Sequence, residues 1–268
     1  KKALKIKIIK TSGDSILNMP LSKIGGKGLF TKEIDDAQLN NKVDIAIHSL
    51  KDLPTELPKG LHLAGVLKRE DPNDAVFSLK EIKLNKSKKK LIVGTSSIRR
   101  KVQLQKLNSR IHVKDIRGNV GTRIKKVGEG KYDCIILATA GLKRLKIQNN
   151  FKKIDVRNII PSAGQGVIAI VTSKNKKIEK LIKELNHTRT FIESDCERLF
   201  LKSLDGSCRT PIGAIAKIVK KEKKDYLFLR YMASSLDGKK MVKGNTFFKL
   251  GSYKKMSLDL GKKIKKLI

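Results

Sequence analysis

The sequence predicts an α/β protein with two parallel-sheet units and a small C-terminal α+β unit. Short apolar, β-branched runs alternate with segments of helical spacing, polar Gly-containing loops separate them, and the last 60 residues alternate before a Lys-rich end. Alternating strands and helices are typical of βαβ units, which bind ligands at the carboxyl ends of their strands. A chain of 268 residues is long enough for more than one domain with a sizeable core.

The first unit opens with an alternating segment that predicts a strand over 4–9. A Gly-rich loop follows at 24–28, then a helix over 29–39 and an apolar, buried strand over 43–50. Pro54 and Pro58 forbid a helical continuation, so a loop is expected after this strand. Residues 68–74 are expected to cross to the second unit.

The second unit repeats the strand–helix alternation. Strands are predicted over 91–95, 111–116 and 132–138, and helical segments over 97–107, 120–127 and 141–145. A further strand is expected over 166–172, followed by helices over 178–186 and 191–204. The remaining residues alternate at 226–232 and 246–250 and end in a Lys-rich helix, which indicates the small α+β unit.

The formal charge of +36 indicates an anionic partner: nucleic acid, a membrane surface or a small anion. Only 12 of the 61 cationic residues are Arg, and the 49 Lys are scattered, as expected for a Lys-biased background on solvated faces. Arg forms bidentate contacts to carboxylate and phosphate, so the positions of the few Arg are the more informative signal. Only 12 aromatic residues are available for stacking on bases, which argues against a nucleic-acid partner.

Several other protein classes are excluded by composition. No run approaches the roughly 20 apolar residues that a membrane span needs. The ordered apolar runs, with only 20 Gly and 6 Pro, exclude a disordered or collagen-like chain. Three Cys in a chain of this length favour a reducing compartment over a disulfide scaffold.

Five arginines are predicted to meet at one edge of the second sheet. They follow successive strands, and they are Arg99, Arg100, Arg117, Arg123 and Arg144. A cation in the first turn of a helix opposes the macrodipole at a cost of about 0.3–1 kcal/mol, which an anion bound to free backbone N–H groups and guanidinium groups would offset. An anion site is therefore the favoured interpretation, and unrelated surface arginines are the alternative.

Three further signals are weaker when taken alone. Asp52 ends the run that follows the strand over 43–50, where a carboxylate among cations stays ionised and can stabilise positive charge; a loop Asp capping a turn is the alternative. The Gly-rich loop lacks the spacing of a phosphate-binding loop, so it is either a lid or a simple turn. Cys134 and Cys196 lie in apolar patterns typical of a core, whereas Cys208 lies in a polar loop beside Arg209, which favours the thiolate. The four His are dispersed, and no metal site is predicted.

Taken together, eight segments resemble the porphobilinogen deaminase (hydroxymethylbilane synthase) family. In the family's order they are IGGKGLFTKEI (24–34), DIAIHSLKDLPTELPKGL (44–61), KREDPNDAV (68–76), GTSSIRRKVQL (94–104), IRGNVGTRI (116–124), YDCIILATAGLKRL (132–145), SAGQGVIAI (162–170) and ERLFLKSLDGSCRTPIG (197–213). They cover most of the chain up to about residue 215, and the last 50 residues match only in pattern.

The resemblance implies a fold of three domains. Two domains would be similar to periplasmic binding proteins, with a cleft between them: domain 1 over 1–70 and 165–186, and domain 2 over 71–164. Domain 3, over 187–268, would be the small α+β domain that carries a cofactor cysteine. The implied enzyme is a transferase that adds four porphobilinogens in succession, each losing ammonia, and releases the linear tetrapyrrole hydroxymethylbilane by hydrolysis.

The resemblance also implies the cofactor and the site residues. Cys208 would hold a dipyrromethane through a thioether, with Ser49, Lys51, Asp52, Ser97, Arg99 and Arg100 helping to bind it. Asp52 would be the catalytic carboxylate, placed against pyrrole N–H groups to stabilise the cationic azafulvene left when ammonia departs. Each pyrrole carries an acetate and a propionate, and the substrate-binding residues would be Arg117, Arg123 and Arg144, with Lys23, Lys27 and Phe30 on a flexible loop. Porphobilinogen is the expected partner of a monomer that binds neither nucleic acid nor membrane, in the cytoplasm or a plastid-like organelle.

The sequence departs from the family pattern in two places. The family's opening strand and helix, with an Arg-x-Ser motif, have no counterpart before Lys1, which predicts an incomplete first domain. Ser207 stands before Cys208 where a second Gly is usual, and Gly tolerates positive φ, so altered cofactor loading is expected. A non-enzymatic anion-binding protein of the solute-binding type is the alternative function, since fold does not fix function.

Overall fold

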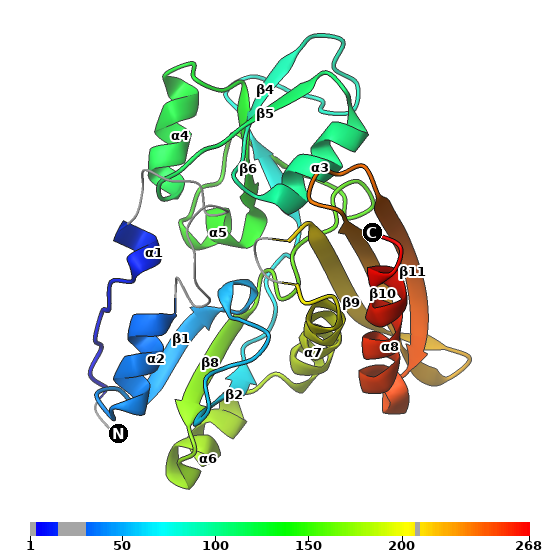
Figure 1. Cartoon of the computed structure of the whole chain (residues 1–268). Coiled ribbons are helices and arrows are strands. Elements are labelled where there is room, and N and C mark those ends of the chain that lie inside the picture. Colours follow the sequence, from blue (N-terminus) through cyan, green and yellow to red (C-terminus); the bar gives the residue numbers. More distant parts are fainter. Residues whose placement is uncertain (1–3, 16–30, 207–209) are drawn as a thin grey trace.

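A computed structural model describes residues 4–15, 31–206 and 210–268, and its strands form three separate sheets (Figure 1). The strands of the first sheet come from two distant parts of the chain, those of the second from between these parts, and those of the third from the C-terminal region. The mixed α/β architecture with a small C-terminal α+β unit is as expected. The division into three domains stays a prediction; each sheet falls within one of the predicted ranges.

The first sheet has the order β1-β8-β2, with β1 at Ile45–Ser49, β8 at Ile168–Ser173 and β2 at Leu61–Val66. The expectation of parallel strands is wrong here, because β8 is antiparallel to both neighbours. The chain leaves this sheet at the end of β2 and returns beside it, where the Leu67 N–H donates to the Ile168 carbonyl at 3.0 Å. A strand that re-enters at the end where the chain left must run the opposite way. Helices α2 (Lys32–Leu39) and α6 (Lys176–Leu185) contact this sheet.

The segment over 4–9 does not form the expected strand. Its alternating apolar side chains Leu4, Ile6 and Ile8 are 87–89% exposed, and it is followed by a short helix α1 (Ser12–Ser15). A strand is stabilised by pairing and by covering one face. Within the described residues no strand pairs with this segment, so its alternating pattern alone does not produce one.

The second sheet is mixed, with the order β5-β4-β6-β3-β7. Strands β4 (Leu91–Gly94), β5 (Ile111–Lys114) and β6 (Cys134–Ala138) form the parallel part that the sequence predicts. Strands β3 (Asp74–Phe77) and β7 (Phe151–Lys153) join it in antiparallel fashion. Helices α3 (Ile98–Leu107), α4 (Val120–Gly128) and α5 (Thr139–Arg144) follow β4, β5 and β6, so their N-termini lie at the carboxyl edge of the parallel strands.

Two connections between the first two sheets run side by side. The Glu70 N–H donates to the Gly166 carbonyl at 2.9 Å, which joins the segment after β2 to the segment before β8. Gly166 has a φ of +84°, and a Cβ there would lie 2.4 Å from the Glu70 carbonyl oxygen. Both the backbone conformation and the close approach therefore require glycine at this crossing.

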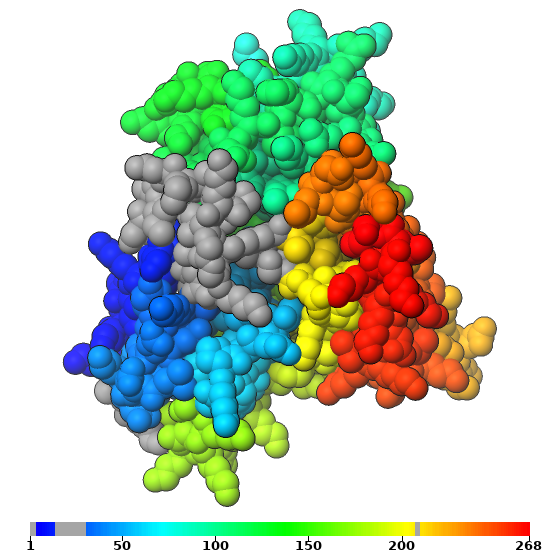
Figure 2. Space-filling view, viewed as in Figure 1, coloured from blue at the N-terminus to red at the C-terminus, as the bar shows by residue number. Residues whose placement is uncertain are grey.

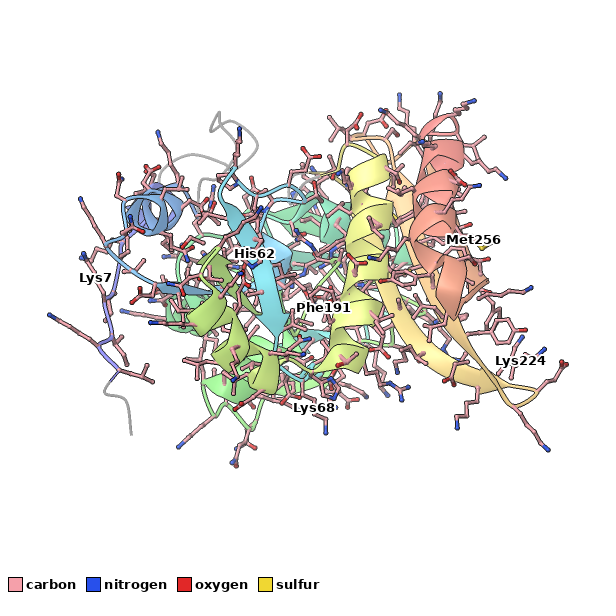
Figure 3. The ribbon with its side chains drawn as sticks, turned by 90° about the horizontal axis from the view of Figure 1, so that it is seen from below. Lys7, His62, Lys68, Phe191, Lys224 and Met256 are labelled. Carbon is pink, nitrogen blue, oxygen red and sulfur yellow. The ribbon has the colours of Figure 1, made fainter. Side chains whose placement is uncertain are left out.

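The third sheet is an antiparallel meander of β9 (Ile212–Lys221), β10 (Lys224–Ser234) and β11 (Met241–Lys249). One face packs on α7 (Thr188–Ser203) and α8 (Tyr253–Lys265), which lie side by side in Figure 3. Their shared core includes Cys196, Phe200, Leu227 and Leu229, all fully buried. In Figure 2 the second sheet's residues form the upper part of the molecule, with the first and third units below it. None of the described helices is long and apolar enough to cross a membrane.

Candidate functional site

Asp52 and Lys51 lie where the first sheet meets the middle of the molecule, in a short 3₁₀ helix η1 (Leu50–Asp52) that directly follows β1. Leu50 fixes this turn, because its side chain is fully buried and its N–H donates to the Val167 carbonyl at 2.9 Å. Asp52 is exposed and Lys51 is half-buried. Burial lowers the pKa of Lys51, and the negative charge of Asp52 opposes that shift. The turn thus presents a carboxylate and a partly desolvated ammonium group next to each other.

The loop after Asp52 is held by an arginine from α7. Arg198 donates to the carbonyls of Leu53 at 3.3 Å, Pro54 at 2.7 Å and Thr55 at 3.3 Å. Pro54 has no N–H and fixes its own φ, so this loop cannot continue the 3₁₀ helix. Arg198 therefore positions the segment that carries Asp52, a role that its place in a helix pattern did not reveal.

His48 lies on β1, close enough to Asp52 for the carboxylate to affect its protonation. The side chain is buried, and its Nε2 has no hydrogen-bond partner among the described residues. Burial lowers the pKa of His48, while Asp52 acts in the opposite direction. A neutral, buried imidazole of this kind fits a structural position.

Arg99 and Arg100 share one buried carboxylate. Arg99 donates from Nη1 to Asp74 Oδ2 at 2.9 Å, and Arg100 donates from Nη2 to Asp74 Oδ1 at 2.7 Å. Further donors of the two groups reach the Ser162 hydroxyl and the Ile160 and Ile136 carbonyls. Burial alone would raise the pKa of Asp74, but Arg100 and Arg99 lower it well below its usual value. The anion that binds these two guanidinium groups is thus a side chain of the protein itself.

Asp74 is therefore a central residue of the site. From the sequence alone it was expected only as the last residue of the segment that crosses to the second unit. Gln165, from the second connection, also donates to its Oδ1 at 2.9 Å and to the Pro72 carbonyl at 2.7 Å. A carboxylate at the start of the buried run Asp74–Phe77 was the available signal, because a buried charge needs partners.

Arg117 and Arg123 extend this group of cations. Arg123 follows the N-terminus of α4, where the Asn119 side chain caps the helix by accepting from the Thr122 N–H at 2.8 Å. Arg123 also donates from Nε to the Gly118 carbonyl at 2.7 Å. Burial lowers the pKa of Arg123, and the nearby charges of Arg100 and Arg117 lower it further. The charges of Arg100 and Arg117 thus both act on Arg123, and a bound anion would relieve that repulsion.

For the remaining predicted site residues, the structure shows only a position in the fold, or they lie outside the described ranges. Ser97 is the N-cap residue of α3 but forms no cap hydrogen bond through its side chain, and Ser49 is the last residue of β1. Arg144 is exposed at the end of α5, and no contact among the described residues joins it to the other arginines. Lys23, Lys27, Phe30 and Cys208 lie outside the described residues.

The combined arrangement suits a ligand with several carboxylates. Arg100, Arg117 and Arg123 provide positive charge from the second unit, and Lys51 provides it from the first. The charges of Arg100, Arg99 and Asp74 also affect the pKa of Lys51, so these groups of the two units lie in one region. Asp52, exposed within the same region, is suited to stabilising a cation that forms on such a ligand.

Two family models match almost the whole chain. Residues 1–180 match the model described as "Porphobilinogen deaminase, dipyromethane cofactor binding domain", and residues 191–268 match "Porphobilinogen deaminase, C-terminal domain".

Curated relatives with the same name are similar over most of their length. The porphobilinogen deaminase of Syntrophomonas wolfei is 43% identical over 91% of this chain and 79% of its own. That of Buchnera aphidicola is 43% identical over 98% of this chain and 83% of its own, and that of Aliarcobacter butzleri is 47% identical over 78% and 68%.

Among solved structures, the chain has a distant likeness to solute-binding proteins. The periplasmic aliphatic sulphonate-binding protein of Escherichia coli is 13% identical, with a TM-score of 0.39 over 65% of this chain and 57% of that one. A substrate-binding domain of a putative amino acid transporter from Streptococcus pneumoniae is 14% identical, with a TM-score of 0.39 over 56% and 67%.

Proposed function

The chain belongs to the porphobilinogen deaminase family, and we propose that the residues around η1, α3 and α4 carry the family's reaction in this protein. The protein is a transferase that condenses four porphobilinogen molecules, with loss of ammonia, into hydroxymethylbilane for tetrapyrrole biosynthesis. Its cofactor is dipyrromethane, attached through a cysteine. The observation that carries the residue assignment is that the charges of Arg100 and Arg117 both act on the guanidinium group of Arg123, whose pKa burial lowers.

The residues present fit this cofactor. Each of its pyrroles carries an acetate and a propionate, and Lys51, Arg100, Arg117 and Arg123 supply positive charge that suits such carboxylates. When bound, the cofactor supplies the pyrrole carbon to which the growing chain is attached.

Cys208 is the proposed attachment point. Cys134 and Cys196 are fully buried, and burial raises the pKa of both thiols to about 12, so neither is available as a thiolate. Cys208 directly precedes Arg209 in a polar stretch of the sequence, and an adjacent guanidinium favours the thiolate form.

Arg99 and Arg100 are proposed to hold cofactor carboxylates with donors that Asp74 does not use. A guanidinium has five N–H donors. The hydrogen bonds among the described residues use three of them on each side chain, which leaves two on Arg99 and two on Arg100. Asp74 and Gln165 then orient the two groups before any ligand arrives, which reduces the entropy lost on binding.

Asp52 is the proposed catalytic carboxylate. Loss of ammonia from the aminomethyl group of porphobilinogen breaks a C–N bond and leaves positive charge on the pyrrole. A carboxylate at the pyrrole N–H stabilises this cation, and it can accept the proton that the acceptor pyrrole loses when the new C–C bond forms. Arg198 supports this role by fixing the three carbonyls that follow Asp52.

The other site assignments rest on sequence position. Arg117, Arg123 and Arg144 are proposed to bind the carboxylates of the substrate and the growing chain, with Ser49 and Ser97 helping to hold the cofactor. Lys23, Lys27 and Phe30 are proposed to cover the site. The protein is proposed to act as a monomer without nucleic acid or membrane, in the cytoplasm or a plastid-like organelle.

A turnover assay tests this function. Purified protein incubated with porphobilinogen is expected to release ammonia and hydroxymethylbilane in a ratio of about four to one, as the condensation of four units requires. A protein that binds porphobilinogen without releasing ammonia would instead be the anion-binding module of the solute-binding type.

A further inference from the structure

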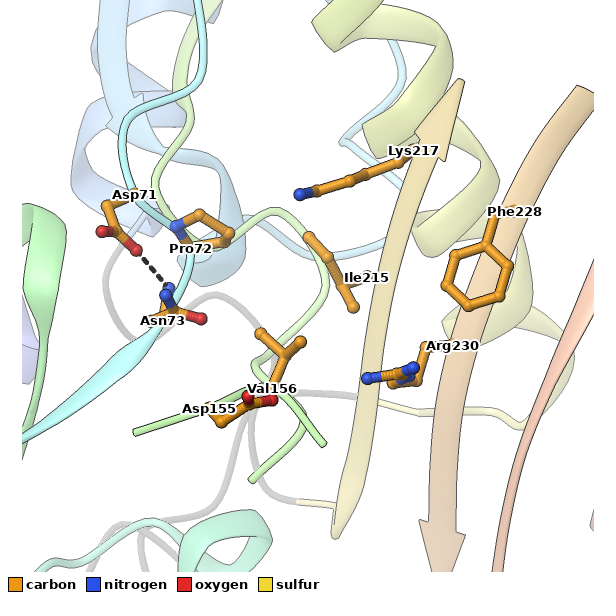
Figure 4. A pocket seen from close by; sticks show the side chains of 9 residues that line it. All are labelled: Asp71, Pro72, Asn73, Asp155, Val156, Ile215, Lys217, Phe228 and Arg230. Atoms are coloured by element: carbon orange, nitrogen blue, oxygen red, sulfur yellow. Dashed lines mark hydrogen bonds between the residues drawn. The ribbon is translucent and has the colours of Figure 1, made fainter. Parts of the chain in front are cut away.

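A pocket of about 550 Å³ lies between the third sheet and the two connections that join the first and second sheets (Figure 4). Its walls are segment 71–73 of one connection, segment 155–156 of the other, and side chains of β9 and β10. Pockets of 300–1,000 Å³ are the usual size for small-molecule sites.

Four side chains of the sheet form a square on the face that lines this pocket. Lys217 pairs across the strands with Phe228, and Ile215 pairs with Arg230. The two cations therefore occupy one diagonal, with Cα atoms roughly 7–8 Å apart, and the two apolar side chains occupy the other. A planar apolar ligand with an anionic group at two of its positions matches this pattern.

The carboxylates in the pocket wall already have cationic partners outside it. Asp71 forms an ion pair with Lys153 at 2.7 Å, and Asp155 forms one with Arg157 at 2.6 Å. Hydrogen bonds from Arg157 lower the pKa of Asp155 to about 2, so this carboxylate stays ionised and paired.

In the described part of the chain, Lys217 and Arg230 have no ion-pair partner of this kind, although Arg230 lies near enough to Asp155 for its charge to help lower the pKa of that carboxyl. Within the described residues neither forms an ion pair, and Arg230 instead lies 5.6 Å from the centre of the Phe228 ring. Lys217 points toward Pro72 and Arg230 toward segment 155–156, so both charged groups face the open space of the pocket (Figure 4). Positive charge on the wall of a concave, partly apolar site attracts anions.

We propose that this pocket is a second binding site, for a small aromatic dicarboxylate. Lys217 and Arg230 each bind one carboxylate, and the ring lies between Phe228, Ile215 and Val156. None of the residues that line this pocket is among those proposed to bind porphobilinogen or the cofactor.

Titration of the holoenzyme with isophthalate, followed by NMR of the Ile215 and Val156 methyl groups, tests the proposal. Isophthalate is expected to shift both signals in a saturable way and to bind about tenfold more tightly than benzoate, because it makes a second charge-assisted contact. The neutral isophthalamide is expected to cause no saturable shift. Equal affinities for isophthalate and isophthalamide would overturn the proposal.

Matched variants locate the binding. Lys217→Gln and Arg230→Gln are each expected to weaken isophthalate binding about tenfold or more, whereas Lys220→Gln, on the same strand but on the opposite face, is expected to leave it unchanged. Turnover of porphobilinogen by the pocket variants confirms that they are folded. Binding that is lost in Arg123→Gln but unchanged in the two pocket variants would place isophthalate in the catalytic region and would contradict a second site.

Discussion

Asp74 lies fully buried with its Oδ1 only 2.7 Å from Nη2 of Arg100. The same carboxylate binds Arg99 through Oδ2, so one negative charge orients two adjacent cations at the start of α3. Asp74 is the first residue of β3, and the arginines follow β4, so the contact joins two strands of the second sheet that are not neighbours. The binding region is thus organised before a ligand enters it.

Replacing Asp74 by Asn is expected to destabilise the protein by about 3–5 kcal/mol, because it leaves two buried guanidinium groups without a counter-charge. Urea unfolding measures the loss. Asp225→Asn, an exposed position on β10, is the control and should leave the unfolding midpoint almost unchanged. A similar small change for both variants would mean that Asp74 is not required to balance the charge.

The stabilisation by Asp74 should also depend on pH. Its pKa is lowered in the folded state, so its contribution is complete above the unfolded pKa of about 3.9 and is lost as pH falls toward the folded pKa. The difference in unfolding free energy between the native protein and Asp74→Asn should therefore shrink below about pH 4. A difference that stays constant from pH 6 to pH 3 would argue against a charged Asp74.

Arg123→Gln is expected to lower kcat/KM for porphobilinogen about 10–100-fold, since a hydrogen bond to a charged group contributes about 1.5–3 kcal/mol. The matched control is Arg110→Gln, directly before the first residue of β5, where the guanidinium donates to the Lys88 carbonyl. Equal steady-state constants for both variants would remove Arg123 from the site.

Lys51 should give the enzyme an alkaline limb in its pH profile. Burial lowers its pKa, so the ammonium group loses its proton below the usual value of about 10.4, and binding of carboxylates should weaken there. Lys51→Arg keeps its charge to above pH 12 and should move this limb of kcat/KM to higher pH. An unchanged limb in Lys51→Arg would assign the titration to another group.

Asp52→Asn is expected to retain the covalent cofactor and to slow turnover by about 10²–10⁴-fold, the usual contribution of a catalytic acid or base. Intact mass and steady-state turnover of the same preparation separate the two effects. Near-normal rates would exclude Asp52 as the catalytic carboxylate.

The regular elements of the second unit could be predicted because their signals are local. Strands β4, β5 and β6 and helices α3 and α4 each begin and end within a few residues of the expected positions. Strand β2 was missed because it follows a proline-rich loop and its burial comes from β8, which lies about a hundred residues further along the chain. Residues 4–9 were expected to form a strand and do not. An apolar side chain at every second position leads to a strand only if a partner strand is present.

For the candidate site, the sequence predicted which residues lie near one another better than it predicted which of them form contacts. The order of strands and helices placed Arg99, Arg100, Arg117, Arg123 and Arg144 at one edge, and in the structure the charges of Arg100 and Arg117 act on Arg123. A carboxylate at the start of an apolar run marks Asp74 as a residue that needs partners, but its pairing with Arg99 and Arg100 could not be predicted, because β3 joins the sheet through an antiparallel pairing that no local pattern shows. Arg144 stays a prediction, as do the residues outside the described ranges.

The intact mass of the purified protein tests the central claim most directly. The account predicts a mass increase equal to two pyrrole units, present in the native protein and absent in Cys208→Ala. An unmodified mass together with no product from porphobilinogen, or an adduct that persists in Cys208→Ala, would contradict it.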